Sequence, residues 1–275
     1  SMATFEINTP KRIAAFLTNV LKESNSLRLL SENTNWNLNA VDSRGNYTQR
    51  FGRFRTADAS TIQTYQNQNG DSKADYAYLN EAAGNISADD GHKYKGRGIL
   101  QLTWKNNYRR ASNGLNAAYG TGAYDLVRDF STVTTDLVVA ARTGAWYWHD
   151  GSSWGNLNDV VDRRDHDDRT NFQATIRGVR GGGDPERLAS WNAIKNVIYD
   201  QNSFGNMREV LKAVGVSAVP RKNYNTKFGI TVNQRSPQEI WPHKDRLLVA
   251  QPTSEIGASL DRYFLPCEIG ELDIY

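Results

Sequence analysis

The sequence predicts a mainly α fold with a smaller C-terminal extension of mixed or β character. In three long segments, apolar residues recur at three- and four-residue spacing, as they do on the buried face of a helix. From residue 201 onward these stripes give way to prolines and short β-leaning runs. A chain of 275 residues is long enough to bury a large core. We therefore expect residues 1–200 to form one helical domain, and residues 201–275 to form an extension of undetermined role that packs on it.

The first predicted helix covers residues 10–23. Thr9 is a suitable N-cap, and Pro10 occupies the first helical position. Glu23 lies at the C-terminal end, along the edge of the apolar stripe. The stripe consists of Ile13, Phe16, Leu17, Val20 and Leu21.

The next segments are less regular. Residues 31–72 are rich in Asn, Ser, Thr, Gly and Gln and predict a loop-rich lobe with a short hairpin near residues 43–46. Residues 73–83 predict a short helix, and residues 84–98 predict turns. Further helices are expected over 99–112, 134–148 and 185–199, and β-leaning runs over 228–232 and 246–249.

The charge balance excludes one class of partner. The chain has 33 Lys and Arg against 30 Asp and Glu, a net charge of +3. This excess is too dilute to predict nucleic-acid binding, which needs basic residues concentrated on one face. It is compatible with a mild attraction to an acidic polymer such as a bacterial cell wall.

Cysteine content and hydropathy restrict the class further. The lone Cys267 cannot form an intrachain disulfide. The longest apolar run, at 137–141, is far shorter than the roughly 20 residues of a membrane-spanning helix. The N-terminal residues lack the pattern of a signal peptide. We expect a protein made in the cytoplasm that reaches the cell wall, in the periplasm or outside, by another export route.

No motif predicts a cofactor or a metal. Residues 162–169 contain metal-ligating residue types but no ligand spacing, and they are interpreted as a solvated helix connection. The glycines at 181–183 lack the Lys-Ser/Thr of a phosphate-binding loop.

Glu23 and Glu32 are the first candidates for chemistry. A carboxyl group at the C-terminal end of a helix lies near the negative end of the helix dipole, which disfavours its charged form. Such an environment suits a general acid, although a solvated glutamate is the commoner case. Two carboxylates flanking a gap wide enough for water are the minimum apparatus for glycoside hydrolysis with inversion. The Asn-rich segment up to Trp36 offers amides and an aromatic face that suit a sugar.

Residues 94–108 carry the most specific motif. They read Tyr-Lys-Gly-Arg-Gly-Ile-Leu-Gln-Leu-Thr-Trp-Lys-Asn-Asn-Tyr. This run resembles the Gly-Arg-Gly-x-x-Gln-Leu-Thr-x-x-x-Asn-Tyr signature of glycoside hydrolase family 19, which comprises chitinases and related phage and bacterial endolysins. Segments 13–36, 140–148 and 175–187 resemble other blocks of that family in the same order, so that the resemblance covers about residues 10–199.

The resemblance implies a lysozyme-like fold with two lobes and a cleft between them. It assigns Glu23 as the general acid. In the endolysin branch, the second acidic position falls on Glu32 and the threonine of the Gln-Leu-Thr block falls on Thr103. These two residues would position or activate the attacking water.

The resemblance also implies substrate-binding residues. Gln101 and Asn107 would be cleft-lining amides, and Tyr94 and Trp104 would be sugar-contacting or packing aromatics. For Arg97, an internal ion pair that holds the lobes together is as good an interpretation as a substrate contact.

Three departures from the family pattern affect these assignments. Lys22 replaces the usual histidine before the acid. The acidic residue that many relatives carry before a Gly-Asp-Gly turn is missing, and Glu81, Asp89 and Asp90 are near enough to take its place, so the base could come from this loop. Arg180 replaces the asparagine of an Asn-Gly-Gly turn, which predicts a subsite for an anionic group of a muramyl unit or peptide.

We therefore expect a peptidoglycan hydrolase, a muramidase-type endolysin or antibacterial effector that cleaves β-1,4 bonds with inversion. The absence of disulfides and the pairing of Glu32 with Thr103 favour the bacterial and phage branch. The alternatives are a chitinase, which Trp104 favours, and an inactive wall-binding protein, which Lys22 favours. The expected partner is peptidoglycan or chitin, bound by a monomer, and the extension could engage a delivery system or an immunity protein.

Overall fold

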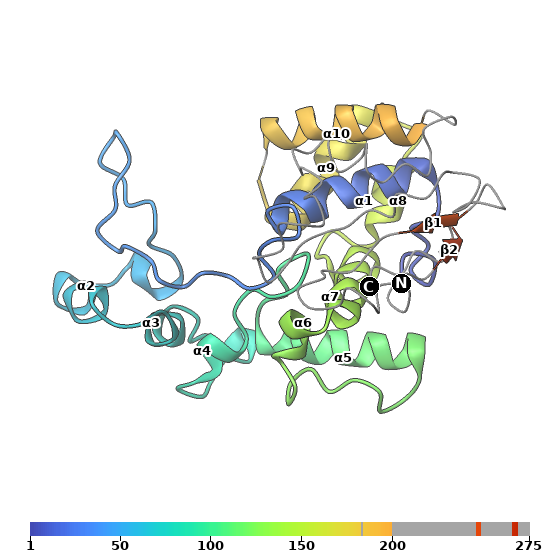
Figure 1. Ribbon diagram of the computed structural model, residues 1–275. Helices are drawn as coiled ribbons and strands as arrows, with labels where there is room; N and C mark the ends of the chain where they lie inside the picture. Colours follow the sequence, from blue (N-terminus) through green and yellow to red (C-terminus); the bar gives the residue numbers. More distant parts are fainter. Residues whose placement is uncertain (183, 200–245, 249–265, 269–275) are drawn as a thin grey trace, which may run out of the picture.

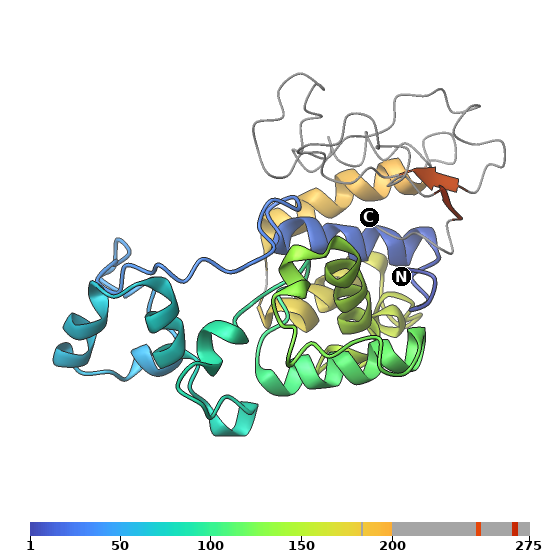
Figure 2. The same ribbon diagram turned by 60° about the horizontal axis from the view of Figure 1, so that its bottom comes forward.

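The computed structural model describes residues 1–182, 184–199, 246–248 and 266–268, and within these residues the mainly α prediction is confirmed (Figures 1 and 2). The α-helices are α1 (Pro10–Glu23), α2 (Ala59–Gln66), α3 (Gly70–Ala77), α4 (Asp90–Lys93), α5 (Lys105–Tyr119), α6 (Thr132–Thr135), α7 (Leu137–Trp146), α8 (Leu157–Val161), α9 (Asp168–Arg180) and α10 (Pro185–Tyr199). Two 3₁₀ turns, η1 (Gly52–Arg55) and η2 (Glu81–Ala83), and one π-helical turn, η3 (Tyr147–Gly151), complete the helical elements.

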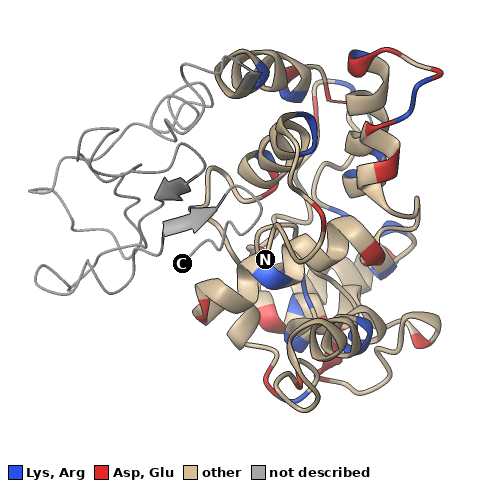
Figure 3. Ribbon diagram, turned by 90° about the vertical axis from the view of Figure 1, so that its right-hand side faces the viewer, with Lys and Arg blue, Asp and Glu red and all other residues tan. Residues whose placement is uncertain are grey.

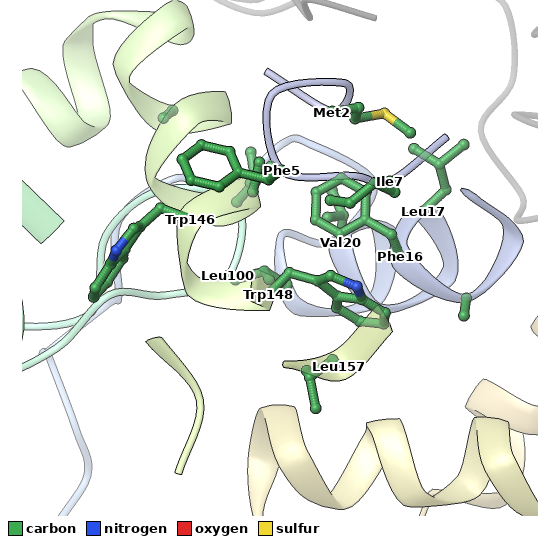
Figure 4. Close-up of a cluster of buried hydrophobic side chains, with 14 of the residues drawn as sticks. Met2, Phe5, Ile7, Phe16, Leu17, Val20, Leu100, Trp146, Trp148 and Leu157 are labelled. Carbon is green, nitrogen blue, oxygen red and sulfur yellow. The ribbon is translucent and has the colours of Figure 1, made fainter. Parts of the chain in front are cut away.

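The large lobe is built around helix α1. In both ribbon views α1 lies beside α10, and it also contacts α8 and α9. Its apolar stripe enters a continuous core with side chains of α5, α7, α8, α9 and α10. Phe16 meets Trp148 edge-on with ring centroids 5.5 Å apart, and both side chains are fully buried (Figure 4). The helix predicted over 10–23 is confirmed at both ends, and Thr9 accepts the N–H of Arg12 as its cap.

A small lobe projects from the large lobe in both ribbon views and contains η1, α2 and α3. It has its own hydrophobic cluster, made of Trp36, Leu38, Phe54, Ile62, Ala74, Ala77 and Tyr78. Residues 31–72 contain more helix than the loop-rich lobe that we expect, because α2 and the start of α3 fall within them. Asp58 caps α2, and Asn69 caps α3. The expected hairpin turn is present, because Val41 and Tyr47 form an antiparallel bridge around it.

The helix predicted over 99–112 begins later than expected, at Lys105. Gln101 and Trp104 have φ values of 52° and 79°, and the left-handed region is incompatible with a continuing right-handed helix. Residues 96–104 therefore form a compact turn ahead of α5. The helix predicted over 134–148 is α7 with its π-helical continuation η3, the helix predicted over 185–199 is confirmed, and the one predicted over 73–83 is divided between α3 and η2.

Strands β1 (Arg246–Leu248) and β2 (Pro266–Glu268) pair antiparallel, with Leu247 opposite Cys267. Strand β1 falls within the β-leaning run at 246–249, whereas the run at 228–232 lies outside the described residues. Among the described residues, no helix combines the length and apolar character that a membrane crossing requires. In the view of Figure 3, basic and acidic residues are interspersed along the helices.

Buried tyrosines predict a loss of stability at alkaline pH. Burial raises the pKa of Tyr108 to about 12 and raises the pKa of Tyr78 as well. Above pH 10, tyrosines of the unfolded chain ionise while these two keep their protons, so the folded state binds more protons. The free energy of unfolding should then fall by about 1.4 kcal/mol per pH unit for each such tyrosine. Urea unfolding between pH 9 and 11 should show a shallower decline for Tyr108→Phe than for wild type, and equal declines would contradict the prediction.

Candidate active site

Glu23 lies where the sequence predicts it, at the last residue of α1. One oxygen of its carboxylate, Oε1, accepts a hydrogen bond from Nη2 of Arg187 at 2.6 Å. The Arg187 side chain is only 4% exposed, whereas the Glu23 side chain is 19% exposed. Glu23 is therefore fixed from the buried side and still reaches solvent.

The guanidinium of Arg187 connects Glu23 to two further polar side chains. Its Nη1 donates to Oδ1 of Asn19 at 2.8 Å, and its Nε lies 3.4 Å from Oδ2 of Asp184. Burial opposes the charge on Asp184, but the backbone N–H and the guanidinium of Arg187 prevail and lower the pKa of Asp184. Asn19 in turn donates to Thr175 of α9 at 3.2 Å. Helices α1, α9 and α10 together thus set the position of Glu23.

Sequence reasoning did not select Arg187 as a site residue. The detectable signal is Asp184 followed by Pro185, a helix start that places an arginine in the first turn of α10. Only the packing of α10 on α1 shows which carboxylate that arginine meets.

Glu32 lies between the two lobes in sequence, directly before the small-lobe segment. Its Oε2 accepts a hydrogen bond from the hydroxyl of Tyr78 at 2.5 Å and one from the N–H of Gly96 at 3.3 Å. Burial first, and the Glu32 carboxylate second, raise the pKa of Tyr78, so its hydroxyl stays protonated and acts as the donor. The backbone N–H of Glu32 also bonds to the carbonyl of Gly96 at 2.9 Å.

The turn at 96–104 brings Gln101 beside Glu32, and hydrogen bonds connect Thr103 and Asn107 to the same turn. A Cβ on Gly96 would lie 2.8 Å from Oε1 of Gln101 and 3.5 Å from Cβ of Glu32, so both side chains lie against this glycine. The hydroxyl of Thr103 donates to the carbonyl of Gln101 at 2.8 Å, and its lone pairs can still accept. Asn107 donates to the carbonyl of Thr103 at 2.8 Å. Asn107 therefore supports the turn.

Burial selects packing over sugar contact for Tyr94, for which both roles are predicted, and it corrects the sugar-contacting role expected of Trp36. Tyr94 is 4% exposed and its hydroxyl donates to the carbonyl of Val127, so it is a packing residue of the large lobe. Trp36 is 9% exposed and packs edge-on against Phe51 with centroids 4.1 Å apart. Trp104 is half-buried, and its ring meets that of Tyr78 edge-on with centroids 5.0 Å apart.

Two arginines also differ from expectation. Arg180 is exposed and donates to Asp184 at 2.9 Å, so its charge is paired and it reaches Glu23 only through Asp184 and Arg187. Arg97 is buried and donates to the carbonyls of His92 and residue 93 at the end of α4. In the part of the chain that the structure describes, no carboxylate pairs with Arg97. The expected internal ion pair is therefore wrong, and the Arg97 side chain instead caps the C-terminal end of α4.

The carboxylates of the 81–90 loop are engaged locally. Asp90 is buried, 3.1 Å from Nζ of Lys105, and accepts two backbone N–H groups of its own loop. Asp89 pairs with Lys93 at 2.5 Å. Glu81 is exposed on η2. Asp90 is thus paired with the first residue of α5, and Asp89 is paired with the last residue of α4.

The structure describes residues 1–182, 184–199 and two short strands, and among these no three His, Cys, Asp or Glu side chains gather as metal ligands would.

Comparison with known proteins relates the sequence of this chain to one family. Residues 32–161 match the profile of glycoside hydrolase family 19, described as chitinase class I. An acidic endochitinase of Solanum chilense is 42% identical over 60 residues, which is 22% of either chain. Chitinase 4 of Oryza sativa subsp. japonica is 31% identical over 91 residues, 33% of this chain and 25% of that protein. The chain thus matches only about a quarter of the length of these relatives.

Two solved structures are also similar. A bacterial family 19 chitinase is 25% identical, with a TM-score of 0.38 and coverage of 76% of both chains. Chitinase C of Streptomyces griseus is 22% identical, with a TM-score of 0.40 and coverage of 80% of this chain and 69% of that one. The matched profile contains Glu32, Gln101 and Thr103, whereas Glu23 and Arg187 lie outside it. The profile match confirms the resemblance to glycoside hydrolase family 19 that the motifs predict.

Proposed function

We propose that this protein is an inverting glycoside hydrolase that cleaves β-1,4 bonds in peptidoglycan. The observation that carries the proposal is the pair of carboxylates of Glu23 and Glu32, in each of which one oxygen accepts hydrogen bonds. Arg187 binds one oxygen of Glu23, and Tyr78 and Gly96 bind one oxygen of Glu32. Inverting glycosidases use such a pair, one as acid and one as base.

In the proposed mechanism, Glu23 gives its proton to the glycosidic oxygen as the bond breaks. Glu32 takes a proton from a water molecule that attacks the opposite face of the sugar. The hydroxyl of Thr103 accepts a hydrogen bond from the same water, because its own proton is directed to the carbonyl of Gln101. The side-chain N–H₂ of Gln101 donates to the carbonyls of Gly98 and Leu29, so in this mechanism its Oε1, beside Gly96, is the atom that it offers to a sugar substituent.

Peptidoglycan is the first substrate candidate for two reasons. The chain has one cysteine, as is typical of the phage and bacterial branch that it resembles rather than of disulfide-rich plant chitinases. Its net charge of +3 suits an anionic wall. In this proposal the protein acts as a monomer at the bacterial cell wall.

Chitin is the second candidate, because the matched profile is described as chitinase class I and the similar proteins are named chitinases. Both polymers contain N-acetylglucosamine joined by β-1,4 bonds, so the same pair of carboxylates could serve either.

The deciding experiment supplies purified murein and chitin oligomers to the same enzyme. We expect the murein suspension to lose turbidity. We also expect the mass spectrum to contain muropeptides that carry newly formed reducing ends. Reaction in ¹⁸O-labelled water followed by anomeric analysis should show inversion. Chitin cleavage with intact murein would select the second candidate, and binding to murein without any cleavage would show a wall-binding protein.

A further inference from the structure

Tyr78 is placed in an unusual position for a buried tyrosine. It is 7% exposed and directly follows helix α3. Its backbone carbonyl accepts a hydrogen bond from the side-chain amide of Asn85 at 3.0 Å. Its ring belongs to the small-lobe cluster, whereas its hydroxyl leaves that cluster and bonds to Glu32 at 2.5 Å.

Three aromatic rings hold the phenol in this orientation. The ring of Trp104 meets it edge-on at 5.0 Å, that of Phe51 lies at 5.1 Å, and that of Trp36 lies at 6.3 Å. The contacts with Trp104 and Phe51 are edge-to-face, and aromatic contacts of this kind are favourable and directional. The hydroxyl therefore has one fixed direction, toward Glu32.

The two oxygens of Glu32 consequently differ. Oε2 accepts both the Tyr78 hydroxyl and the Gly96 N–H. Oε1 accepts no hydrogen bond from the described residues. A carboxylate with one oxygen bound and one free can turn only a single oxygen toward a water molecule.

We propose that Tyr78 is a positioning residue that directs Oε1 of Glu32 at the attacking water. The inference rests on the proposed function, in which Glu32 is the base. Tyr78 acts through Glu32 and does not contact the reacting atoms. Tyr78 and the three aromatic rings packed around it thereby link the packing of the small lobe to the orientation of Glu32.

The test compares Tyr78→Phe with Tyr76→Phe on whichever polymer wild type cleaves. The first variant removes one oxygen and keeps the ring in its cluster. Tyr76 is the matched control, because its ring packs in the same lobe against Phe54 with centroids 4.7 Å apart and its hydroxyl bonds to no described residue. Hydrogen bonds to charged groups predict a loss of about 10- to 100-fold in kcat for Tyr78→Phe, with KM within about twofold. Tyr76→Phe should keep kcat within about twofold.

A double-mutant cycle separates positioning from a merely structural effect. Glu32→Asp shortens the side chain by one methylene, so its carboxylate no longer reaches the phenol. Adding Tyr78→Phe to Glu32→Asp should then cost less than about twofold in kcat. The positioning role would be overturned by additive losses, by an unchanged kcat in Tyr78→Phe, or by an effect on KM alone. None of these outcomes would contradict cleavage by the wild-type protein. Failure of wild type to cleave either polymer would instead reject the proposed function.

Discussion

Glu23→Gln is expected to lower the rate of glycosidic cleavage by about 10²- to 10⁴-fold, the range that general acid catalysis contributes. The glutamine amide matches the carboxyl group in shape, and its oxygen can still accept the hydrogen bond from Arg187. The substitution removes the proton that the leaving oxygen needs and leaves the surrounding contacts in place. The measurement is kcat on the preferred polymer, with binding followed by co-sedimentation.

Glu81→Gln is the matched control for this experiment. Glu81 is exposed on η2 and belongs to the loop that supplied the alternative base. Its substitution should leave kcat within about twofold, as is typical of surface positions. Full activity in Glu23→Gln would reject Glu23 as the acid, and a large loss in Glu81→Gln would move the base to the 81–90 loop.

The predicted helices whose ends carry cap residues were found at the expected residues. Thr9 with Pro10 starts α1, and Asp184 with Pro185 starts α10. The predicted start of α5 is too early because Gln101 and Trp104 adopt positive φ values. A positive φ can be expected from the sequence at a glycine, but not at a glutamine or a tryptophan. Local propensity was overridden there by the tertiary contacts of the turn.

The candidate site was predicted only in part for a related reason. Motifs locate the two carboxylates and the turn, but their hydrogen-bond donors lie far away in the chain. Arg187 is separated from Glu23 by 164 residues, and Tyr78 from Glu32 by 46 residues. Pairs at such separations depend on how the helices pack, and an arginine or a tyrosine alone predicts no partner.

Aromatic residues show the same limit. Tyr94 has the residue type of a sugar contact, yet its ring fills the core beside Tyr108 with centroids 5.3 Å apart. The amphipathic ring serves both purposes equally well. Burial decides between them, and burial is a property of the assembled fold.

Arg187→Met is expected to lower the free energy of unfolding by about 3–5 kcal/mol, the cost of removing one partner from a buried ion pair. The methionine fills part of the volume but donates no hydrogen bond. Asp184, Asn19 and Glu23 would each lose a donor or a neighbouring charge, and Asn19 is fully buried. Molecules that remain folded should also lose activity, because no other described group holds Oε1 of Glu23. Urea unfolding and kcat at a temperature where the variant is folded measure the two effects.

Arg180→Met provides the comparison, since Arg180 binds the same Asp184 from the exposed side at 2.9 Å. An exposed ion pair contributes about 1 kcal/mol or less, so this variant should remain close to wild type in stability and activity. Equal losses in the two variants would show that Asp184, and not Glu23, is what Arg187 serves. Arg187→Lys sharpens the distinction, because one ammonium group retains the charge but cannot reproduce the planar fork that reaches Asn19 and Glu23 together. If charge alone matters, lysine restores both stability and kcat; if the orientation of Glu23 matters, lysine restores stability in part and leaves kcat low.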